Sequence, residues 1–409
     1  MQDNEKKPAL RFKGFTDPWE QRKLGEIAKA VVRNDPASDA PIMMITAGNG
    51  FIEQSDRYAF NNAGESLKKY ILLECGELAY NHGASKLRPY GSCFALTTVE
   101  KARIPFVYHC FSVEKSNPEF LSIELNGANV ENQLRKIVSS GARMDGLLNI
   151  AYSEYTEVTV QLPKKEEQDW IAKFFKHLDT LITLHQRKYE KLVNIKKSML
   201  DKMFPQNGAS VPEIRFKGFT DPWEQRKLGE IAKEVVRNDP ASDAPIMMIT
   251  AGNGFIEQSD RYAFNNAGES LKKYILLERG ELAYNHGASK LRPYGSCFAL
   301  TTVEKARIPF VYHCFSVEKS NPEFLSIELN GANVENQLRK IVSSGARMDG
   351  LLNIAYSEYT EVTVQLPKKE EQDWIAKFFK HLDTLIALHQ RKLEKLQNIK
   401  KSCLEKMFV

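Results

Sequence analysis

The sequence contains none of the patterns that mark secreted, membrane-spanning or common enzymatic proteins. No apolar run approaches the roughly 18 residues of a membrane span, and the first residues have no apolar core typical of a signal peptide. No GxGxxG after a strand, no P-loop, no GxSxG and no HExxH occurs. We therefore expect a cytoplasmic protein without a catalytic centre of these kinds.

Cysteine and histidine show no arrangement typical of a metal site. The six cysteines form no CxxC pair, the spacing on which most zinc modules depend. Cys93, His109 and Cys110 are conceivable ligands, but His109 and Cys110 lie in an aromatic and β-branched run that is better explained as a core strand. We expect reduced, partly buried cysteines, no metal, and no cofactor bound by this chain.

The composition is that of a globular protein. Hydrophobic residues make up 42% of the chain and charged residues 27%, both ordinary values. A length of 409 residues suffices for two or three domains. The net charge of +5 favours anionic partners only mildly, so it does not by itself establish nucleic-acid binding.

The strongest feature is an internal repeat of a whole domain with its following helix. RFKGFTDPWEQRKLGEIA begins at Arg11 and again at Arg215, and the register holds without a gap to Phe204 and Phe408. This period is far too long for a solenoid. Seven positions differ, five of them in the helix: Ala30/Glu234, Cys75/Arg279, Thr183/Ala387, Tyr189/Leu393, Val193/Gln397, Met199/Cys403 and Asp201/Glu405. Two helices that face each other need not be identical, although drift after a recent duplication produces the same pattern.

Each copy ends in a stretch that predicts one long amphipathic helix. Over 164–204, and again over 368–408, apolar residues recur at steps of three and four, and no Gly or Pro interrupts the first stretch before Pro205. At 1.5 Å per residue such a helix is about 60 Å long, so its apolar stripe needs a partner. We predict a coiled coil between the two helices through Leu178, Ile182, His185, Tyr189, Leu192, Leu382, Ile386, His389, Leu393 and Leu396.

The loop between the copies predicts how these helices pair. Residues 205–213 (PQNGASVPE) extend over at most about 30 Å, roughly half the helix length, so the second domain must start near the far end of the first helix. The second helix can then bury its stripe only by running back antiparallel. We therefore predict domains over 1–163 and 206–367, spacer helices over 164–205 and 368–409, and approximate two-fold symmetry within the chain.

Within a copy the pattern predicts an α+β domain. Asn117 and Pro118 form an N-cap and first-turn pair for a helical run to about 139, interrupted at 126–127. Residues 117–120 also faintly resemble the NPPF-type motif of amino-methyltransferases, but the second proline is missing, so we favour the cap. Aromatic and β-branched runs between Gly, Asn and Pro turns predict strands over 40–47, 68–81, 91–98 and 106–114, and alternation predicts one at 158–162.

Three polar loops have the composition of a surface that reads nucleic acid. YNHGASKLRPYG at 80–91 combines amide, hydroxyl, imidazole and basic side chains without an acidic residue, and loops at 46–60 and 139–146 add further polar residues. Asn and Arg suit bidentate contacts to base edges, while Ser and Lys suit phosphates. An ordinary solvated loop is the alternative for each residue. The predicted DNA-binding residues are Asn49, Arg57, Asn81, His82, Ser85, Lys86, Arg88, Tyr90, Arg143, Asn253, Arg261, Asn285, His286, Ser289, Lys290, Arg292, Tyr294 and Arg347.

Several motifs together resemble the specificity subunit of type I restriction-modification systems. They are WEQRKLGEIA near the start of a copy, GELAYNHGASKLRPYG in its middle and GLLNIAYSEYTEVTVQLPKKEEQDWIAKFFKHLDTLI at the entry to the helix, within a duplicated plan that covers essentially the whole chain. The resemblance implies two target recognition domains on an antiparallel coiled coil. It also implies a non-catalytic subunit that binds DNA, two methyltransferase subunits and two restriction and translocation subunits, with S-adenosylmethionine, ATP and Mg²⁺ on those partners.

The near-identity of the copies departs from the family's usual pattern of two unlike recognition domains. Two identical recognition domains predict an inverted-repeat target split by a non-specific spacer. If both domains approach the same face of the duplex, the half-site centres lie about one helical turn, roughly 34 Å, apart. The coiled coil would set the spacer length. Arg279, where the first copy has Cys75, would add a phosphate contact or be neutral. A freestanding DNA-binding regulator and an enzyme with an unfamiliar motif are the alternative functions.

Overall fold

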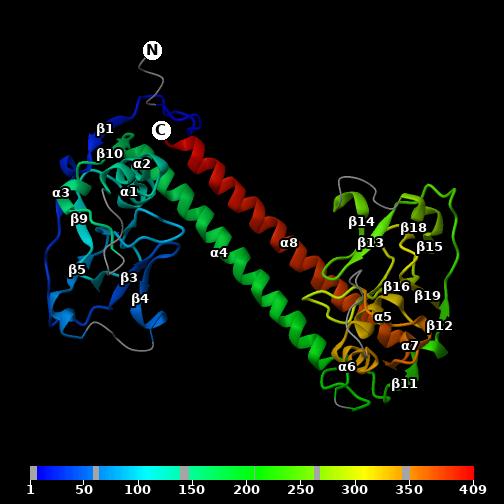
Figure 1. Ribbon diagram of the computed structural model, residues 1–409. Helices are drawn as coiled ribbons and strands as arrows, with labels where there is room; N and C mark the ends of the chain where they lie inside the picture. The colour runs from blue at the N-terminus through cyan, green and yellow to red at the C-terminus, as the bar shows by residue number, and fades with distance from the viewer. Residues whose placement is uncertain (1–6, 59–63, 139–146, 207, 262–267, 343–350) are drawn as a thin grey trace. The chain divides into compact units, whose positions relative to one another are not determined.

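The computed structural model describes residues 7–58, 64–138, 147–206, 208–261, 268–342 and 351–409. The chain divides into two compact units, one formed by Met1–Gln186 with Arg391–Val409 and the other by Arg187–Gln390. Each unit therefore contains one domain and one end of each long helix (Figure 1). The fold class is α+β, as predicted.

The first copy consists of short strands, short helices and one long helix. Its strands are β1 Glu20–Lys23, β2 Ala28–Ala30, β3 Met43–Thr46, β4 Gly50–Glu53, β5 Ile71–Glu74, β6 Leu78–Asn81, β7 Ser92–Ala95, β8 Lys101–Ile104, β9 His109–Val113 and β10 Thr159–Leu162. Its helices are α1 Pro118–Leu125, α2 Ala128–Ile137, α3 Tyr152–Tyr155 and α4 Lys165–Lys202, with 3-10 turns η1 Leu24–Glu26, η2 Gln54–Asp56 and η3 Gly64–Lys69.

The second copy repeats this succession. Its strands are β11 Glu224–Lys227, β12 Ala232–Glu234, β13 Met247–Thr250, β14 Gly254–Glu257, β15 Ile275–Glu278, β16 Leu282–Asn285, β17 Ser296–Ala299, β18 Lys305–Ile308, β19 His313–Val317 and β20 Thr363–Leu366. Its helices are α5 Pro322–Leu329, α6 Ala332–Ile341, α7 Tyr356–Tyr359 and α8 Lys369–Met407, with 3-10 turns η4 Leu228–Glu230, η5 Gln258–Asp260 and η6 Gly268–Lys273.

The domain of unit 1 is built on a four-stranded antiparallel sheet of order β2-β9-β6-β7. In this sheet Tyr80 of β6 lies opposite Cys93 of β7 and His109 of β9. Three antiparallel pairs accompany it, namely β1 with β10, β3 with β4 and β5 with β8. Because successive side chains of a strand point to opposite faces, the sheet contributes to two separate cores.

The two cores divide the domain between them. Leu78 and Tyr80 belong to the core that also holds α1 and the start of α4, whereas Ala79 belongs to the core that holds β3, β5 and β8. In Figure 1, β1, β10, α1 and α2 lie at the end of the unit 1 domain from which α4 starts, and β3 and β4 lie at the opposite end. The first core therefore anchors the long helix, and the second carries the β3–β4 hairpin.

Helix α1 begins at the predicted cap. The side chain of Asn117 accepts a hydrogen bond from the backbone N–H of Phe120 at 3.0 Å, and Pro118 lies in the first turn. The helical run breaks at 126–127 and resumes as α2, as predicted. The cap interpretation of this segment is therefore confirmed.

Antiparallel packing of the long helices, as predicted, is confirmed within unit 1. The ring centroids of Phe175 in α4 and Phe408, just beyond α8, lie 6.1 Å apart, and further along α4 Asp179 pairs with Lys400. Residues further along α4 thus contact residues earlier in α8, as in antiparallel helices. The backbone N–H of Leu10 also donates to the carbonyl of Lys406 at 2.8 Å, so the end of α8 completes the unit 1 core.

Unit 2 shows the same packing with the two helices exchanged. The ring centroids of Phe204, just beyond α4, and Phe379 of α8 lie 6.1 Å apart, and Lys196 pairs with Asp383. Phe204 and Phe379 are the counterparts of Phe408 and Phe175. Each unit is therefore completed by the end of the helix that belongs to the other copy.

Some predicted strand boundaries differ from the structure. The run 68–81 contains two strands, β5 and β6, separated by a turn in which Gly76 has a φ of 89°. The segment before residue 40, where no strand was predicted, contains β1, which pairs with β10. The prediction did not include β2, β4 and β8. These strands have only three or four residues, and pairing with other strands defines them.

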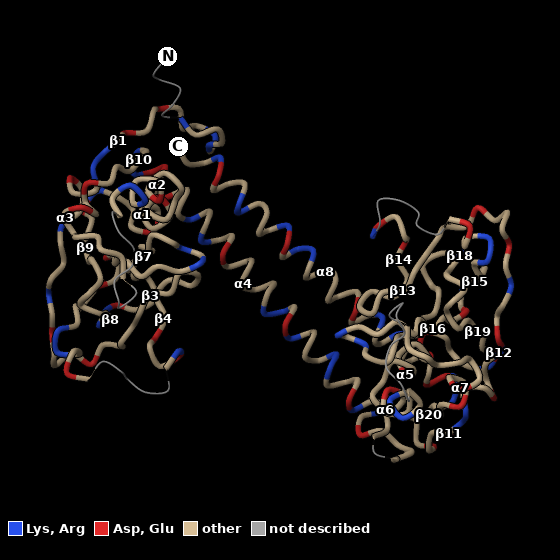
Figure 2. Tube along the Cα trace, in the orientation of Figure 1, with Lys and Arg blue, Asp and Glu red and all other residues tan. Residues whose placement is uncertain are grey.

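The predicted stripe of the long helices is buried or half-buried at each predicted position. Leu178, Leu382 and Leu393 are buried, and the half-buried residues are Ile182, His185, Tyr189, Leu192, Ile386, His389 and Leu396. Figure 2 shows basic and acidic residues interspersed along both helices, as is typical of a solvated face. Among the described residues, no helix has an apolar stretch long enough to cross a membrane.

Candidate nucleic-acid interface

Two hairpin loops of the unit 1 domain lie together beyond the ends of β3 and β6. The side-chain amide of Asn81 donates to the carbonyl of Ile45 at 3.1 Å, which joins the two strand ends. A Cβ placed on Gly48 would lie 3.6 Å from Cδ2 of Leu87, so the tip of one loop covers the turn of the other. We call the surface formed by 46–50 and 84–89 the loop platform; its counterpart in unit 2 is 250–254 and 288–293.

Asn81 and His82 hold the β6–β7 loop in place. The Oδ1 of Asn81 accepts a hydrogen bond from the N–H of Gly83 at 2.9 Å, and the ring nitrogens of His82 lie 2.7 and 2.9 Å from the carbonyl oxygens of Leu148 and Val107. His82 is only 6% exposed. The expectation that these two side chains face DNA is therefore corrected, because internal hydrogen bonds use their polar atoms. The same correction applies to Asn285 and His286.

Arg88 also points into the domain. Its Nη1 donates to the carbonyl of Asn126 at 2.6 Å, and burial lowers the pKa of its guanidinium. The N–H of Ser85 donates to the carbonyl of Arg88, and the N–H of Arg88 to the Oγ of Ser85, both at 3.0 Å. Arg88, predicted to read bases, is thus corrected to a residue that anchors the loop. Arg292 makes the same contact with Asn330.

The end of the β6–β7 loop next to β7 depends on a glycine. Gly91 has a φ of 83°, and a Cβ there would lie 2.6 Å from the carbonyl oxygen of Asn81, so a larger residue would displace the backbone. The hydroxyl of Tyr80 donates to the carbonyl of Tyr90 at 2.6 Å, and the half-buried Tyr90 packs against the first core; Tyr294 does so in unit 2. The loop is therefore held at both ends, and its tip faces solvent.

Few polar side chains remain exposed on the loop platform. They are those of Asn49, Ser85 and Lys86, and Leu87 is exposed between them. Lys86 forms no ion pair with any residue that the structure describes, and neither loop of the platform contains an acidic residue. The platform thus presents an amide, a hydroxyl and an ammonium group around one aliphatic side chain. In unit 2 these residues are Asn253, Ser289, Lys290 and Leu291.

Arg57 and Arg261 are not brought to the loop platform. Because β3 and β4 pair antiparallel, Arg57, beyond the end of β4, lies at the opposite end of the hairpin from Asn49. Its guanidinium carbon lies 5.9 Å from the ring centroid of Tyr58. The same topology separates Arg261 from Asn253. Arg143 and Arg347 fall outside the described residues.

Two kinds of exposed apolar residue were not predicted. Leu87 and Leu291 are 66% and 64% exposed on the loop platforms, and Trp170 and Trp374 are 59% and 60% exposed on the long helices. Both signals are present in the sequence. Leu87 interrupts a polar run, and Trp170 precedes the stripe of its helix by one residue.

The histidine and cysteine cluster of the domain is a packing feature. Cys110 is 4% exposed in β9, which confirms the core-strand interpretation. The rings of His82 and His109 stack with centroids 5.0 Å apart, and burial raises the pKa of the Cys93 thiol to about 12. Within the described part of the chain, no three potential ligands from His, Cys, Asp and Glu form a group that could hold a metal ion.

The two substitutions between the domains lie outside the loop platform. Arg279 precedes β16, at the opposite end of that strand from the platform loop. Its guanidinium donates to Glu304 Oε1 at 2.6 Å and to the carbonyl of Thr301 at 2.5 Å. Glu234 is exposed in β12. The charge of Arg279 is therefore paired locally, which favours the neutral alternative over a phosphate contact.

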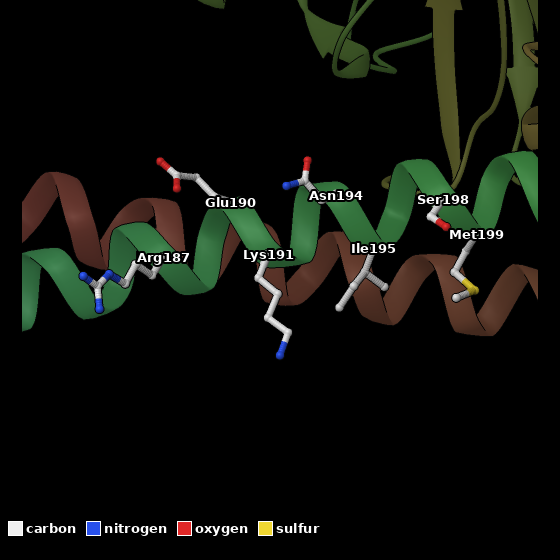
Figure 3. Close-up of a pocket in the computed structure, with 7 residues that line it drawn as sticks. All are labelled: Arg187, Glu190, Lys191, Asn194, Ile195, Ser198 and Met199. Carbon is white, nitrogen blue, oxygen red and sulfur yellow. The ribbon is translucent and has the colours of Figure 1, made fainter. Parts of the chain in front are cut away.

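A shallow groove lies on α4 within unit 2. None of its seven lining residues is buried, so the groove is an open surface feature. Figure 3 shows the side chains in two rows along the helix, Arg187, Lys191, Ile195 and Met199 in one and Glu190, Asn194 and Ser198 in the other.

These features define an α+β protein with two equivalent polar loop platforms, one in each unit, and two long helices that run from one unit into the other. A family model described as the type I restriction modification DNA specificity domain matches residues 16–194. Residues 220–398 repeat that segment with five differences. The chain belongs to the specificity subunits of type I restriction-modification systems, which confirms the family that the motifs predicted.

Solved structures of such subunits are similar over nearly the whole chain. The S subunit of the type I system from M. genitalium has the same fold, with a TM-score of 0.56 at 13% identity over 98% of this chain and 99% of that chain. The HsdS subunit from Thermoanaerobacter tengcongensis is 15% identical, with a TM-score of 0.41 over 95% of this chain and 96% of that chain.

Proposed function

We propose that each loop platform of this specificity subunit contacts one half of a bipartite DNA target. The observation that carries the proposal is a pair of anchored loops that expose hydrogen-bonding groups without acidic residues. Both units contain it in the same geometry, since the Asn81–Ile45 and Asn285–Ile249 hydrogen bonds both measure 3.1 Å. An asparagine amide suits the edge of adenine, and a lysine suits a phosphate.

The proposed target is an inverted repeat, because the exposed residues of the two platforms are identical. Methylome sequencing of cells that express the chain with its methyltransferase subunit tests this directly. The expected result is one methylated motif with two identical half-sites in opposite orientation, separated by unspecified bases. An asymmetric motif would contradict the equivalence of the platforms.

Replacing Lys86 and Lys290 by alanine should weaken DNA binding about equally for every sequence. Each exposed ammonium group that neutralises a phosphate releases counterions, so the slope of log K against log salt should fall by about one for each lysine. Fluorescence anisotropy over a salt series measures this slope. Lys176→Ala with Lys380→Ala is the matched control, since these exposed lysines pair with Glu119 and Glu323; an equal effect in the control would argue against the platform.

We propose further that this chain contains no catalytic centre. In this proposal two methyltransferase subunits supply the S-adenosylmethionine chemistry, and two restriction and translocation subunits supply ATP- and Mg²⁺-dependent cleavage. Assays of the purified chain with and without the methyltransferase separate the alternatives. Methylation or cleavage by the chain alone would favour an enzyme, and tight specific binding without a stable methyltransferase complex would favour a freestanding regulator.

The proposed methyltransferase contact is the aromatic patch of Phe12, Trp170 and Phe174. The ring centroids of Phe12 lie 5.8 Å from Trp170 and 5.6 Å from Phe174, and Trp170 is more than half exposed. Tryptophan is among the residues that dominate protein interfaces. The same patch occurs in unit 2, where the ring centroid of Phe216 lies 5.6 Å from that of Trp374 and 5.9 Å from that of Phe378. Two equivalent patches fit two copies of one partner.

Replacing Trp170 alone should therefore change the stoichiometry of the complex. With Trp374 intact, Trp170→Ala should bind one methyltransferase instead of two, and the variant that also carries Trp374→Ala should bind none at concentrations that saturate the wild type. Native mass spectrometry counts the subunits. Leu184→Ala with Leu388→Ala, which changes exposed leucines further along the helices, is the control. Loss of the partner only in this control would place the contact there instead.

A further inference from the structure

Leu87 has a degree of exposure that the fold does not require. Its side chain is 66% exposed at the tip of the β6–β7 loop, next to exposed Lys86, and Leu291 is 64% exposed in the same place. In the described part of unit 1, Val32 alone among the large apolar side chains is more exposed, at 82%. Single exposed aliphatic side chains are common on protein surfaces, but this one lies on a surface whose other exposed side chains are polar, where a ligand could bury it.

The surrounding contacts hold this side chain in one position. The two hydrogen bonds between Ser85 and Arg88 close a tight turn around it, and Arg88 is itself fixed to Asn126. Cδ2 of Leu87 lies over Gly48, where a Cβ would approach to 3.6 Å. The turn thus fixes the backbone from which Leu87 projects, and its side chain lies beside Gly48 on the same surface as the exposed Asn49 and Lys86. A preorganised contact of this kind discriminates well because binding costs little entropy.

The neighbours of Leu87 indicate what it contacts. They are hydrogen-bonding and basic groups, which suit a DNA duplex, whereas the exposed tryptophans have aromatic neighbours that suit a protein. A leucine can make only apolar contacts, and the one apolar group on a base edge in the major groove is the C5 methyl of thymine. A wedge between base pairs, or a protein contact, is the competing explanation.

We infer that Leu87 and Leu291 each contact the C5 methyl group of a thymine in the major groove of one half-site, and so determine specificity at that position. The inference rests on the proposed DNA-reading function of the loop platforms. It adds that the thymine of one A·T pair, at the same place in each half-site, is recognised by its methyl group.

The test uses the chain in complex with its methyltransferase and the duplex identified by methylome sequencing. Each thymine of the half-sites is replaced in turn by deoxyuridine, which removes only the methyl group. At one position of the half-site, the replacement should weaken wild-type binding about 4-fold when it is made in one half-site and about 15-fold when it is made in both. Leu87→Asn with Leu291→Asn, which keeps the side-chain size, should bind both duplexes equally. Leu87→Met with Leu291→Met should retain the preference for thymine.

Val32→Ala with Val236→Ala is the control, since it truncates exposed valines outside the loop platform and should leave the thymine preference unchanged. Equal binding of every thymine and deoxyuridine duplex by the wild type would overturn the inference. In that case the measured specific binding leaves the proposed function standing. Loss of the methyltransferase from the Leu87→Asn variant with its thymine preference intact would also overturn the inference. Absence of specific binding to any duplex would instead refute the proposed function.

Discussion

Replacing Glu167 and Glu371 by alanine is expected to lower the unfolding free energy of each unit by about 3 kcal/mol or more. Glu167, in the first turn of α4, binds Arg11 bidentately, with Nε–Oε1 and Nη2–Oε2 distances of 2.8 and 2.6 Å. The side chains of Arg11 and Glu167 are 12% and 2% exposed. Alanine would leave a largely buried guanidinium without its counter-charge and would detach the segment before the domain from α4. Arg215 and Glu371 form the same pair in unit 2.

Denaturant unfolding followed by circular dichroism measures this loss. Changing both copies together keeps the two units equivalent. Glu26→Ala with Glu230→Ala is the matched control, because the Arg22–Glu26 pair is about half exposed, at 44% and 47%, and such pairs contribute less than about 1 kcal/mol. If the two variants lose the same stability, burial does not determine the strength of these ion pairs.

The buried glutamate of each unit is expected to contribute stability that is lost as the pH rises from about 4.5 to about 7. Burial raises the pKa of Glu124 from 4.5 to about 7, although one carboxylate oxygen accepts the N–H of Gln161 at 2.9 Å. Burial likewise raises the pKa of Glu328 to about 7. Between these pH values the folded state retains a proton that the unfolded state has lost, so raising the pH favours unfolding. The full loss above pH 7 is about 3 kcal/mol in each unit.

Glu124→Gln with Glu328→Gln should abolish this dependence, because glutamine keeps an oxygen for the N–H of Gln161 and cannot ionise. The variant should gain about 3 kcal/mol per unit over the wild type between pH 4.5 and pH 8. Glu74→Gln with Glu278→Gln should show the opposite sign, since a hydrogen bond from Lys101 lowers the pKa of Glu74, and Lys305 lowers that of Glu278. That stabilisation is present at high pH and lost as the pH falls. Parallel pH profiles for the wild type and the Glu124→Gln variant would contradict the prediction.

Local signals were sufficient for most elements of the fold. The predicted helix over 164–204 is α4, and the predicted strand at 158–162 contains β10. Asn117 caps α1 as predicted because a cap depends on residues only three positions apart. Among the strands that were missed, β1 is exposed, and pairing with β10, far away in the sequence, defines it.

The loop platform was predicted as a region but not residue by residue. Composition placed polar and basic residues in one loop, and Ser85 and Lys86 are exposed there. Asn81, His82 and Arg88 have the same composition, yet the structure uses them internally. Their partners Ile45, Leu148 and Asn126 lie 36, 66 and 38 residues away. No local pattern encodes such distances, so the sequence does not distinguish an anchoring residue from a reading residue.

The sequence by itself determined that two near-identical α+β domains alternate with two long helices, and that those helices must bury an apolar stripe. Repetition and periodicity are properties of the chain, and they follow from residue spacing alone. Only the tertiary structure decided which residues close each core. Phe408 packs against Trp19 and Phe120 of the first copy, and Phe204 against Trp223 and Phe324 of the second. The apolar stripe of a long helix must be buried, but its sequence does not specify which surface buries it. That surface exists only when distant segments have folded together.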